Sequence, residues 1–193
     1  SGLGEESARA LSSVGATVTM LARNPEKLEA AIKGIKANNP SADLRIGIVD
    51  LADLSSIRAY VDNFLQTETA IDVLINNAGI MACPLMRTSD GFEMQFGTNH
   101  IGHFLLTNLL MPAIQSGKNP RIVNLSSAGH THADVNLEDP NFEKSEYNAW
   151  ESYGRSKSAN IHFTQELARR HGSYLQTFAV HPGVIITELG RHL

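Results

Sequence analysis

The chain has 193 residues, of which 42% are hydrophobic and 19% charged, and its formal net charge at pH 7 is -4. This composition is typical of a globular domain, and an acidic balance without a basic stripe argues against a nucleic-acid surface. The single cysteine, Cys83, excludes an internal disulfide and suits a reducing compartment. Its longest apolar run, residues 104–113, is shorter than the ~20 residues that span a bilayer, so we expect no membrane segment and a cytoplasmic location.

Short β-branched runs alternate along the chain with longer amphipathic runs. The amphipathic runs predict helices at residues 4–13, 25–38, 53 or 55 to 65, 92–116 and 150–171, the fourth irregular near Gly97 and Gly102. The β-branched runs predict strands at residues 16–22, 44–49, 71–75, 121–125 and 175–180. This alternation indicates an α/β fold with a doubly wound, Rossmann-like parallel sheet, and we expect a single domain over residues 1–193.

Several motifs directly follow predicted strands. Asn76-Asn77-Ala78-Gly79 follows one strand, Ser126-Ser127 follows the next, and Pro182-Gly183 follows the last. Ligands of such sheets bind outside the carboxyl ends of the strands. We therefore predict one ligand site at this edge, although a Pro-Gly pair after a strand is also a common turn.

Tyr153 and Lys157 lie four residues apart on a predicted helix and so share one face. An ammonium about 5 Å from a phenol stabilises the phenolate by ~3 kcal/mol at an effective dielectric constant of about 20, which is about two pK units. That shift would bring the pKa of the phenol toward neutrality, where a general acid/base works best. The alternative is an exposed helical pair without a catalytic role.

Three further features point to a nucleotide. Ser1-Gly2-Leu3-Gly4 opens the first helix, where glycines let a pyrophosphate approach the helix N-terminus, although a simple turn explains the motif equally well. Arg23 follows the strand at 16–22 and suits the 2′-phosphate of NADP better than the free hydroxyl of NAD, or it is an exposed loop residue. Asp50, before Leu51, either meets an adenine or caps the next helix.

Together these motifs resemble those of the short-chain dehydrogenase/reductase family, and most closely its retinol-dehydrogenase-like and WW-domain-oxidoreductase-like branch. The similarity runs over nearly all of the chain. The motifs that carry it are the glycine motif at residues 1–4, Asp50-Leu51, residues 76–79, Asn99, Ser127, the Tyr153/Lys157 pair, and Pro182-Gly183 through Thr187.

The resemblance implies an NAD(P)-dependent oxidoreductase that interconverts an alcohol and a carbonyl by hydride transfer. Tyr153 would be the general acid/base, and Lys157 would lower its pKa and hold the nicotinamide ribose. Ser127 would bind the substrate oxygen. Asn99 would position a water that links Lys157 to solvent, unless it is a solvent-facing residue of its helix.

The resemblance also implies a set of cofactor-binding residues, with NADP favoured by Arg23 and NAD possible. The set is Ser1, Gly2, Leu3, Gly4, Arg23, Asp50, Leu51, Asn77, Ala78, Gly79, Tyr153, Lys157, Pro182, Gly183 and Thr187. In the family another strand precedes the glycine motif, and a substrate lid follows the last predicted strand. We therefore expect that the chain is a fragment without them.

Residues 129–149 form an acidic insertion with Phe142 and Tyr147, close to Trp150. It either borders the substrate cleft, which would favour a neutral apolar substrate, or is a solvated surface excursion. The apolar residues 104–110 indicate a helix buried on two sides, either in a homodimer or in the core of one subunit. We expect no metal site, because no carboxylate or cysteine completes a set with the paired histidines at 100/103 and 130/132.

Two other functions fit part of the pattern. A sugar-nucleotide epimerase of the extended branch shares the Tyr/Lys pair, but the Asn-Asn-Ala-Gly turn argues against it. A nucleotide-sensing or scaffold protein would keep the fold without catalysis. The intact set of Asn99, Ser127, Tyr153 and Lys157 favours an enzyme with a small-molecule substrate.

Overall fold

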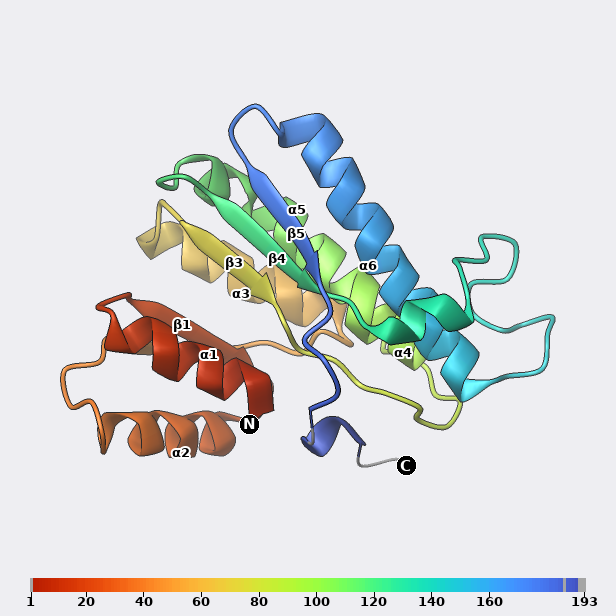
Figure 1. Ribbon diagram of the computed structural model, residues 1–193, viewed down its shortest axis with the longest axis horizontal. Helices are drawn as coiled ribbons and strands as arrows, with labels where there is room; N and C mark the ends of the chain where they lie inside the picture. The colour runs from red at the N-terminus through yellow and green to blue at the C-terminus, as the bar shows by residue number, and fades with distance from the viewer. Residues whose placement is uncertain (1, 186, 191–193) are drawn as a thin grey trace. The chain divides into compact units, whose positions relative to one another are not determined.

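The structure is a computed structural model that describes residues 2–185 and 187–190, so Ser1, a predicted cofactor residue, lies outside the described residues. The chain divides into two compact units, residues 1–50 and residues 51–193. Figure 1 draws the elements of both units and labels most of them.

The first unit is a two-stranded parallel sheet with two helices. Its elements are α1 (Gly2–Ser13), β1 (Val18–Ala22), α2 (Pro25–Lys36) and β2 (Leu44–Ile48). The side chain of Asn24 accepts a hydrogen bond from the Lys27 backbone N–H at 2.9 Å, so α2 begins with Pro25 in its first turn, as predicted. Ala8 of α1, Met20 of β1 and Ile35 of α2 pack in one apolar core.

The second unit is a three-stranded parallel sheet in the order β3-β4-β5. Its strands are β3 (Val73–Asn76), β4 (Arg121–Leu125) and β5 (Gln176–Val180). Its α-helices are α3 (Leu54–Thr67), α4 (Met94–Phe96), α5 (Gly102–Gln115) and α6 (Ala149–His171). Its other helical segments are the π-helix η1 (Gly97–Ile101) and the 3-10 helices η2 (Ala128–His132) and η3 (Glu188–Gly190).

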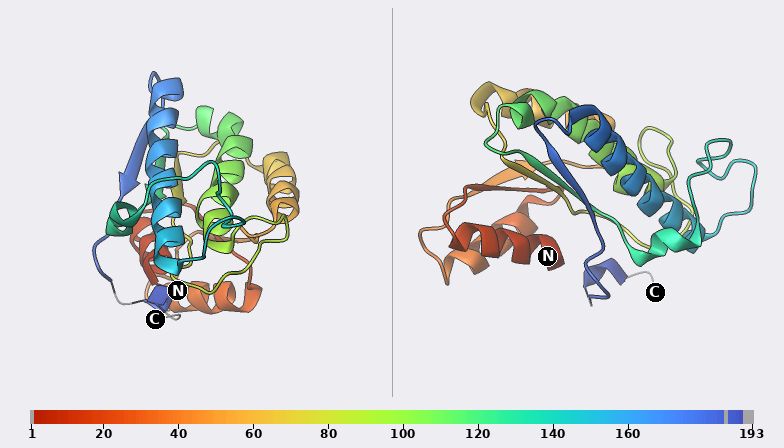
Figure 2. Two further views of the ribbon diagram at one scale, coloured as in Figure 1. Left: turned by 90° about the vertical axis from the view of Figure 1, so that its right-hand side faces the viewer. Right: turned by 45° about the horizontal axis from the view of Figure 1, so that its top comes forward.

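The predicted α/β class is confirmed, since every pairing between described strands is parallel. The strands pair as two sheets, one in each unit. In the second unit, α6 packs on β4 and β5, α5 packs on β3, and α3 packs on α5 (Figure 1). Figure 2 shows these three helices along one face of the sheet. None of the helices in the described part of the chain is long and apolar enough to cross a bilayer.

The helix predicted at residues 92–116 is irregular where the glycines predicted it. It consists of the short α4, the π-helical turn η1 and the longer α5. The Gly102 N–H donates to the Gly97 carbonyl, five residues back, which is the hydrogen bond of a π-helix. Asn99 lies in the middle of this turn and is fully buried.

A buried polar network joins the sheet to its helices. The Asn76 amide of β3 donates to Thr107 Oγ1 at 2.9 Å and to Asn124 Oδ1 at 2.8 Å. The Asn124 amide of β4 then donates to Thr164 Oγ1 at 2.9 Å. Breaking any of these hydrogen bonds would leave a buried polar atom unpaired, which is costly. The network therefore fixes how α5 and α6 lie on the two strands.

Candidate functional site

The four predicted catalytic residues all belong to the second unit, near the carboxyl end of β4. Asn99 lies in η1, Ser127 precedes η2, and Tyr153 and Lys157 lie on α6. Asn99 is 0% exposed, Tyr153 is 3% exposed and Lys157 is 5% exposed. The alternatives of an exposed Tyr/Lys pair and a solvent-facing Asn99 are therefore wrong.

The Lys157 side chain contacts the carboxyl end of β4. Its ammonium donates a hydrogen bond to the Leu125 carbonyl at 3.0 Å and lies 5.6 Å from the centroid of the Tyr153 ring. Burial lowers the pKa of Lys157 to about 8, because an ammonium loses its hydration there. With this pKa, Lys157 gains and loses its proton at pH values close to neutrality.

The pKa of Tyr153 differs from the sequence prediction. Burial raises this pKa above its usual value, and a hydrogen bond with the Ser127 side chain acts in the opposite direction. The Lys157 ammonium is directed to the Leu125 carbonyl, so its attraction does not offset the cost of burying a phenolate. The predicted lowering toward neutrality is thus corrected to a raised pKa.

Ser127 and Gly129 place the phenol against the backbone of η2. The Ser127 hydroxyl accepts a hydrogen bond from the Gly129 N–H at 3.0 Å. A Cβ atom on Gly129 would lie 2.8 Å from two carbon atoms of the Tyr153 ring, so only glycine allows this contact. The neighbouring Ser126 hydroxyl instead donates to the Lys157 carbonyl at 2.9 Å and holds α6 on the strand end.

Asn99 ties the segment after β3 to α6. Its Oδ1 accepts from the Ile80 N–H at 2.9 Å, and its Nδ2 donates to the Ile80 carbonyl at 2.9 Å and to Ser156 Oγ at 3.0 Å. Both hydrogens of the side-chain amide are thereby used. A Cβ atom on Gly79 would lie 3.1 Å from Asn99 Oδ1 and 3.7 Å from Lys157 Nζ, so Gly79 closely borders both residues.

The other cofactor residues predicted in this unit are less enclosed. Asn77 is half-buried and Ala78 exposed between β3 and Gly79. Pro182 and Gly183 are exposed beyond β5, and Thr187 Oγ1 accepts from the Leu189 N–H at 3.3 Å in η3. Leu51 is half-buried at the start of the unit, ahead of α3.

The first unit holds the remaining cofactor predictions. Gly2, Leu3 and Gly4 form the start of α1. The Arg23 side chain is 68% exposed and forms an ion pair with Asp50 at 4.0 Å. The role of Asp50 as a helix cap is wrong, because Asp53 caps α3 by accepting from the Ser55 and Ser56 N–H groups at 2.8 and 3.2 Å.

Two contacts around the site have no counterpart in the predictions. His181 Nδ1 accepts from the Ala128 N–H at 3.3 Å and links the segment after β5 to η2. The buried Gln95 amide donates to Tyr147 Oη at 3.0 Å and to the Ala149 carbonyl at 2.8 Å, at the start of α6. Gln95 follows Phe92 in the predicted helix. In the sequence, the only sign of its role is that a polar residue lies on a face of the helix that is otherwise buried.

The acidic insertion is an anchored loop. The Asp139 carboxylate accepts hydrogen bonds from the backbone N–H groups of Glu143, Lys144 and Ser145. Arg155 of α6 donates to the Asp139 carbonyl at 2.9 Å and stacks 4.0 Å from the centroid of the Phe142 ring. The loop is therefore fixed to the helix that carries Tyr153 and Lys157.

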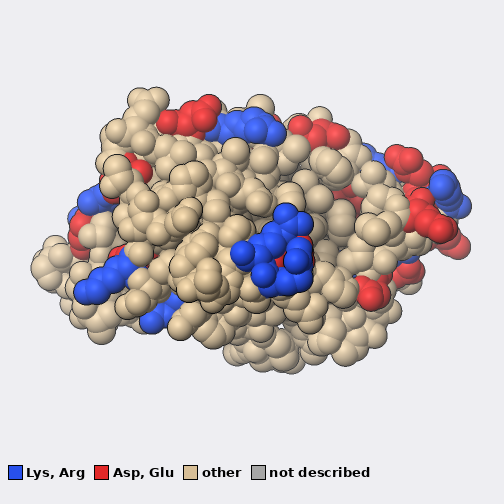
Figure 3. Space-filling view, turned by 90° about the horizontal axis from the view of Figure 1, so that it is seen from above, with Lys and Arg blue, Asp and Glu red and all other residues tan. Residues whose placement is uncertain are grey.

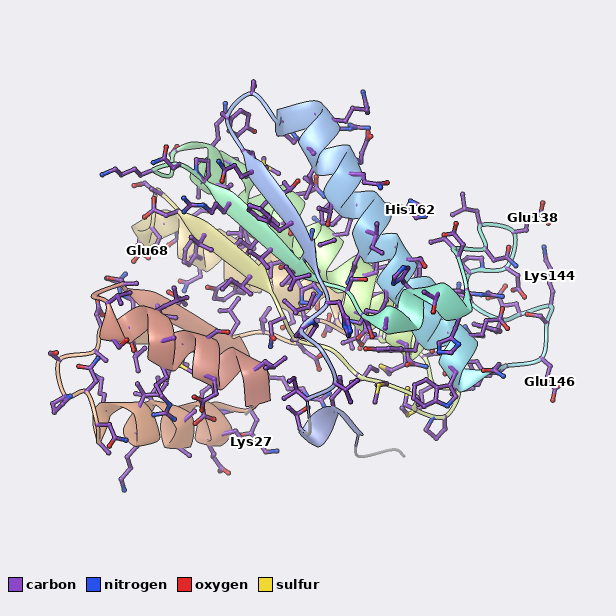
Figure 4. All side chains as sticks on the ribbon, viewed as in Figure 1. Lys27, Glu68, Glu138, Lys144, Glu146 and His162 are labelled. Atoms are coloured by element: carbon purple, nitrogen blue, oxygen red, sulfur yellow. The ribbon has the colours of Figure 1, made fainter. Side chains whose placement is uncertain are left out.

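The outer side of this loop carries most of its charge. Glu138, Lys144 and Glu146 project outward from it in Figure 4. Figure 3 shows acidic side chains gathered at the right-hand side of the face seen from above. Four acidic residues of the insertion, Asp134, Glu138, Glu143 and Glu146, are thus exposed, whereas Asp139 is buried.

A hollow of about 370 Å³ opens between η2 and the start of α6, lined by His132, Ala133, Asn148, Trp150 and Glu151. The Trp150 ring forms an edge-on contact with the Tyr153 ring, with 6.4 Å between centroids. None of the four predicted catalytic residues, Asn99, Ser127, Tyr153 and Lys157, lines this hollow. Its wall at Trp150 nevertheless adjoins the phenol.

No group of three histidine, cysteine or acidic residues suited to a metal ion occurs among residues 2–185 and 187–190. Two histidines have other partners: buried His103 Nδ1 lies 2.9 Å from the Asn99 carbonyl, and half-buried His100 Nδ1 lies 3.1 Å from Asn160 Oδ1. Burial lowers the pKa of both rings, that of His103 to about 4.

Comparison with known proteins gives relatives over the whole chain. The chain is 44% identical to human retinol dehydrogenase 13 over 192 residues, which is 99% of the chain and 58% of that protein. It is 45% identical to human retinol dehydrogenase 14 over 207 aligned positions, covering 100% of the chain and 61% of that protein. The chain thus spans about three fifths of the length of these relatives.

Solved structures agree in fold. An uncharacterized protein from Mycobacterium paratuberculosis has a TM-score of 0.85 and 46% identity, with 100% of this chain and 68% of that chain covered. A protein from Shigella flexneri 2a, solved in complex with NADP and described as a short chain dehydrogenase, has a TM-score of 0.79 and 22% identity, with 100% of this chain and 77% of that chain covered.

The sequence profile of the short chain dehydrogenase family matches residues 1–193. This match agrees with the retinol dehydrogenases, with the parallel strands of both units and with the order of the motifs. The resemblance inferred from the sequence is thereby confirmed. The chain belongs to the short chain dehydrogenase family.

Proposed function

We propose that the protein is an NADP(H)-dependent oxidoreductase that interconverts an alcohol and a carbonyl, with NAD as a possible second cofactor. The observation that carries this proposal is the constellation at the end of β4 of three buried residues, Tyr153, Lys157 and Asn99, with the half-buried Ser127. The names of two relatives support it: retinol dehydrogenases 13 and 14 are 44% and 45% identical to this chain.

The residues of the second unit fit a nicotinamide cofactor. A Cβ atom on Gly79 would crowd Asn99 Oδ1 at 3.1 Å, so glycine lets the segment proposed to bind the cofactor lie close against Asn99 and Lys157. In the proposal, residues 77–79, Lys157 and the segment from Pro182 to Thr187 bind the cofactor in this unit. Such a cofactor, when bound, donates or accepts the hydride.

The first unit supplies the rest of the proposed cofactor contacts. Residues 1–4 would bind the pyrophosphate at the start of α1. Arg23 would bind the 2′-phosphate of NADP, and its largely exposed side chain leaves the guanidinium accessible. Asp50 would lie at the adenine.

The protonation of the buried groups favours reduction of a carbonyl. Because burial raises the pKa of Tyr153, the phenol holds its proton at neutral pH and is ready to donate it to a carbonyl oxygen. Ser127 would donate a hydrogen bond to the same oxygen and orient it toward the phenol. Lys157, with a pKa of about 8, would be mostly protonated at pH 7 and would stabilise the tyrosinate left after proton transfer.

We propose a neutral, apolar aldehyde or ketone as the substrate. The exposed Trp150 ring next to Tyr153 offers an apolar wall to such a molecule, and His132 lies 6.3 Å from the same ring between centroids. The names of the relatives favour a retinoid within this class. A cytoplasmic location and a homodimer belong to the proposal and are tested by cell fractionation and by light scattering.

The test is a substrate panel on the full-length protein. NADPH oxidation is followed by absorbance with aldehydes, ketones, retinaldehyde, an acyl-CoA and UDP- and GDP-sugars, with wild type beside Tyr153→Phe. We expect turnover of a neutral substrate by wild type, and in Tyr153→Phe unchanged NADPH binding with a loss of about 100-fold or more in kcat. Near-normal activity of Tyr153→Phe would exclude the mechanism.

The same panel separates the rival functions. NADPH binding without turnover of any compound would favour a sensor or scaffold protein. Conversion of a sugar nucleotide would favour an epimerase. Faster turnover of the acyl-CoA than of every neutral compound would contradict the proposed substrate class.

A further inference from the structure

Asn160 lies one helical turn after Lys157 on α6 and is 3% exposed. Its Nδ2 donates to two backbone carbonyls, that of Leu125 at 3.1 Å and that of Asn99 at 3.2 Å. Its Oδ1 lies 3.1 Å from His100 Nδ1. One side-chain amide therefore joins the end of β4, the π-helical turn and α6.

The Leu125 carbonyl is shared between Asn160 and Lys157. Lys157 Nζ donates to this oxygen at 3.0 Å and Asn160 Nδ2 at 3.1 Å. A carbonyl oxygen has two lone pairs, so these two donors fill its capacity. The amide holds the oxygen in place, and its positive N–H end also reduces the attraction that the oxygen exerts on the ammonium.

The Asn99 carbonyl is held in a similar way. It lies 2.9 Å from His103 Nδ1 and accepts from Asn160 Nδ2 at 3.2 Å. A carbonyl is only an acceptor, so His103 must carry its proton on Nδ1. The backbone of the turn that carries Asn99 is thus fixed by buried donors from both α5 and α6.

Three titratable groups near Lys157 in the described part of the chain carry no charge at neutral pH. Tyr153 faces it from α6 and is a neutral phenol. His103 of α5 and His100 of η1 are neutral, because burial lowers the pKa of both. The end of β4 presents Asn124, Leu125 and Ser126, none of which titrates. The hydrogen bonds at the Leu125 carbonyl are therefore the local control on the ammonium.

We propose that Asn160 is a positioning residue of this site, which fixes the Leu125 carbonyl, competes with Lys157 for that oxygen, and so sets the protonation equilibrium of Lys157. The significance of this for catalysis rests on the proposed function, whereas the contacts themselves do not.

The experiment measures the titration of Lys157 in the full-length protein by NMR of ¹³Cε-labelled lysines, with the Lys157 signal assigned by its loss in Lys157→Met. Two variants, Asn160→Leu and Asn160→Asp, are compared with Thr164→Val. Thr164 lies on the same helix, accepts from Asn124 in the buried network and donates to the Asn160 backbone carbonyl at 2.7 Å, but it contacts neither the Asn160 side-chain amide nor the Leu125 carbonyl nor Asn99 in the described hydrogen bonds. Thr164→Val is therefore a matched control for a lost buried hydrogen bond.

In Asn160→Leu the Leu125 carbonyl serves the ammonium alone, so we expect the midpoint of the Lys157 titration to rise by about 0.5 pH unit or more. In Asn160→Asp a carboxylate adds its attraction, and we expect a rise of about 1 pH unit or more. Thr164→Val should lower thermal stability and leave the midpoint unchanged. The pH profile of kcat/KM should move in the same order.

Equal midpoints in wild type, Asn160→Leu and Thr164→Val would overturn the inference. If Asn160→Leu fails to fold, Asn160→Asp decides, and an unchanged or lowered midpoint in that variant overturns it. Failure of the proposed function gives a different result: the midpoints would still move as stated, while no variant and no wild-type sample would turn over any substrate.

Discussion

The residues proposed for proton transfer and those proposed for nucleotide binding differ in how the chain holds them. Asn99, Tyr153 and Lys157 are 0%, 3% and 5% exposed, and their partners are buried backbone and side-chain groups. The Arg23 side chain is 68% exposed, and Pro182 and Gly183 are exposed beyond β5. The chain itself therefore organises the acid/base groups, whereas the proposed nucleotide contacts lie at the surface.

The largest expected effect comes from removing the buried ammonium. Lys157→Met keeps the length of the side chain and the apolar fit, so the fold should persist while kcat/KM falls by about 100-fold or more. Steady-state kinetics with NADPH provides the measurement. Lys144→Met is the control, because Lys144 is exposed and bonds the Glu138 carbonyl at 3.0 Å, so its loss should leave turnover intact. If Lys157→Met turned over substrate at the wild-type rate, the buried ammonium would not be required. The proposed proton-transfer residues would then not differ in importance from the proposed nucleotide-binding residues.

Buried His103 should make the protein acid-sensitive. Its pKa is about 4 when folded against a usual 6.5, so the unfolded chain binds the proton first as the pH falls. Stability is therefore complete above pH 6.5 and is lost as the pH falls toward 4, by up to about 3 kcal/mol. Urea unfolding at a series of pH values should show this slope in wild type and a flatter one in His103→Gln. Equal slopes in the two proteins would contradict the assignment.

A methyl group behind the phenol should disturb catalysis more than stability. In Gly129→Ala the new Cβ would lie 2.8 Å from the Tyr153 ring, and the displaced phenol should lower kcat by about tenfold or more. Gly34→Ala is the matched control, since its Cβ would meet no atom within 4 Å. We expect Gly34→Ala to raise stability by up to about 1 kcal/mol without changing kcat, as measured by thermal unfolding and kinetics. A Gly129→Ala enzyme with normal kcat would show that the contact is not required.

The smallest effect is expected at the surface. Arg23→Ser should lower the preference for NADP over NAD, measured as a ratio of kcat/KM values, by about tenfold or less, because salt and solvent screen an exposed guanidinium. The kcat with saturating cofactor should not change. A fall in kcat of the same size as in Lys157→Met would instead place Arg23 among the catalytic groups.

The sequence predicted the elements well and their local chemistry in part. The alternation of β-branched and amphipathic runs marked all five described strands, and the glycines at 97 and 102 marked the break in the long helix. The separation of the strands into two sheets was not predicted, because a strand's own sequence does not specify which strand pairs with it.

The limits of sequence reasoning are clearest at Tyr153 and Asn160. Spacing alone places an amine one turn from the phenol, but it does not show that Lys157 donates to the Leu125 carbonyl and that burial then dominates the pKa of Tyr153. The sequence does not single out Asn160, because its partners are backbone carbonyls, which no side-chain pattern reveals. Acidic residues in the insertion, likewise, did not show that Asp139 turns inward.

The stretch from Tyr153 to Lys157 meets a different neighbour at almost every position. Arg155 stacks on Phe142 of the acidic loop, and Ser156 accepts a hydrogen bond from Asn99. The residues between the tyrosine and the lysine are thus more than spacers. An engineer who grafts only the two ends of this stretch onto another helix should obtain a pair without its supports, and a working transplant would need the loop, the π-helical turn and the strand end as well.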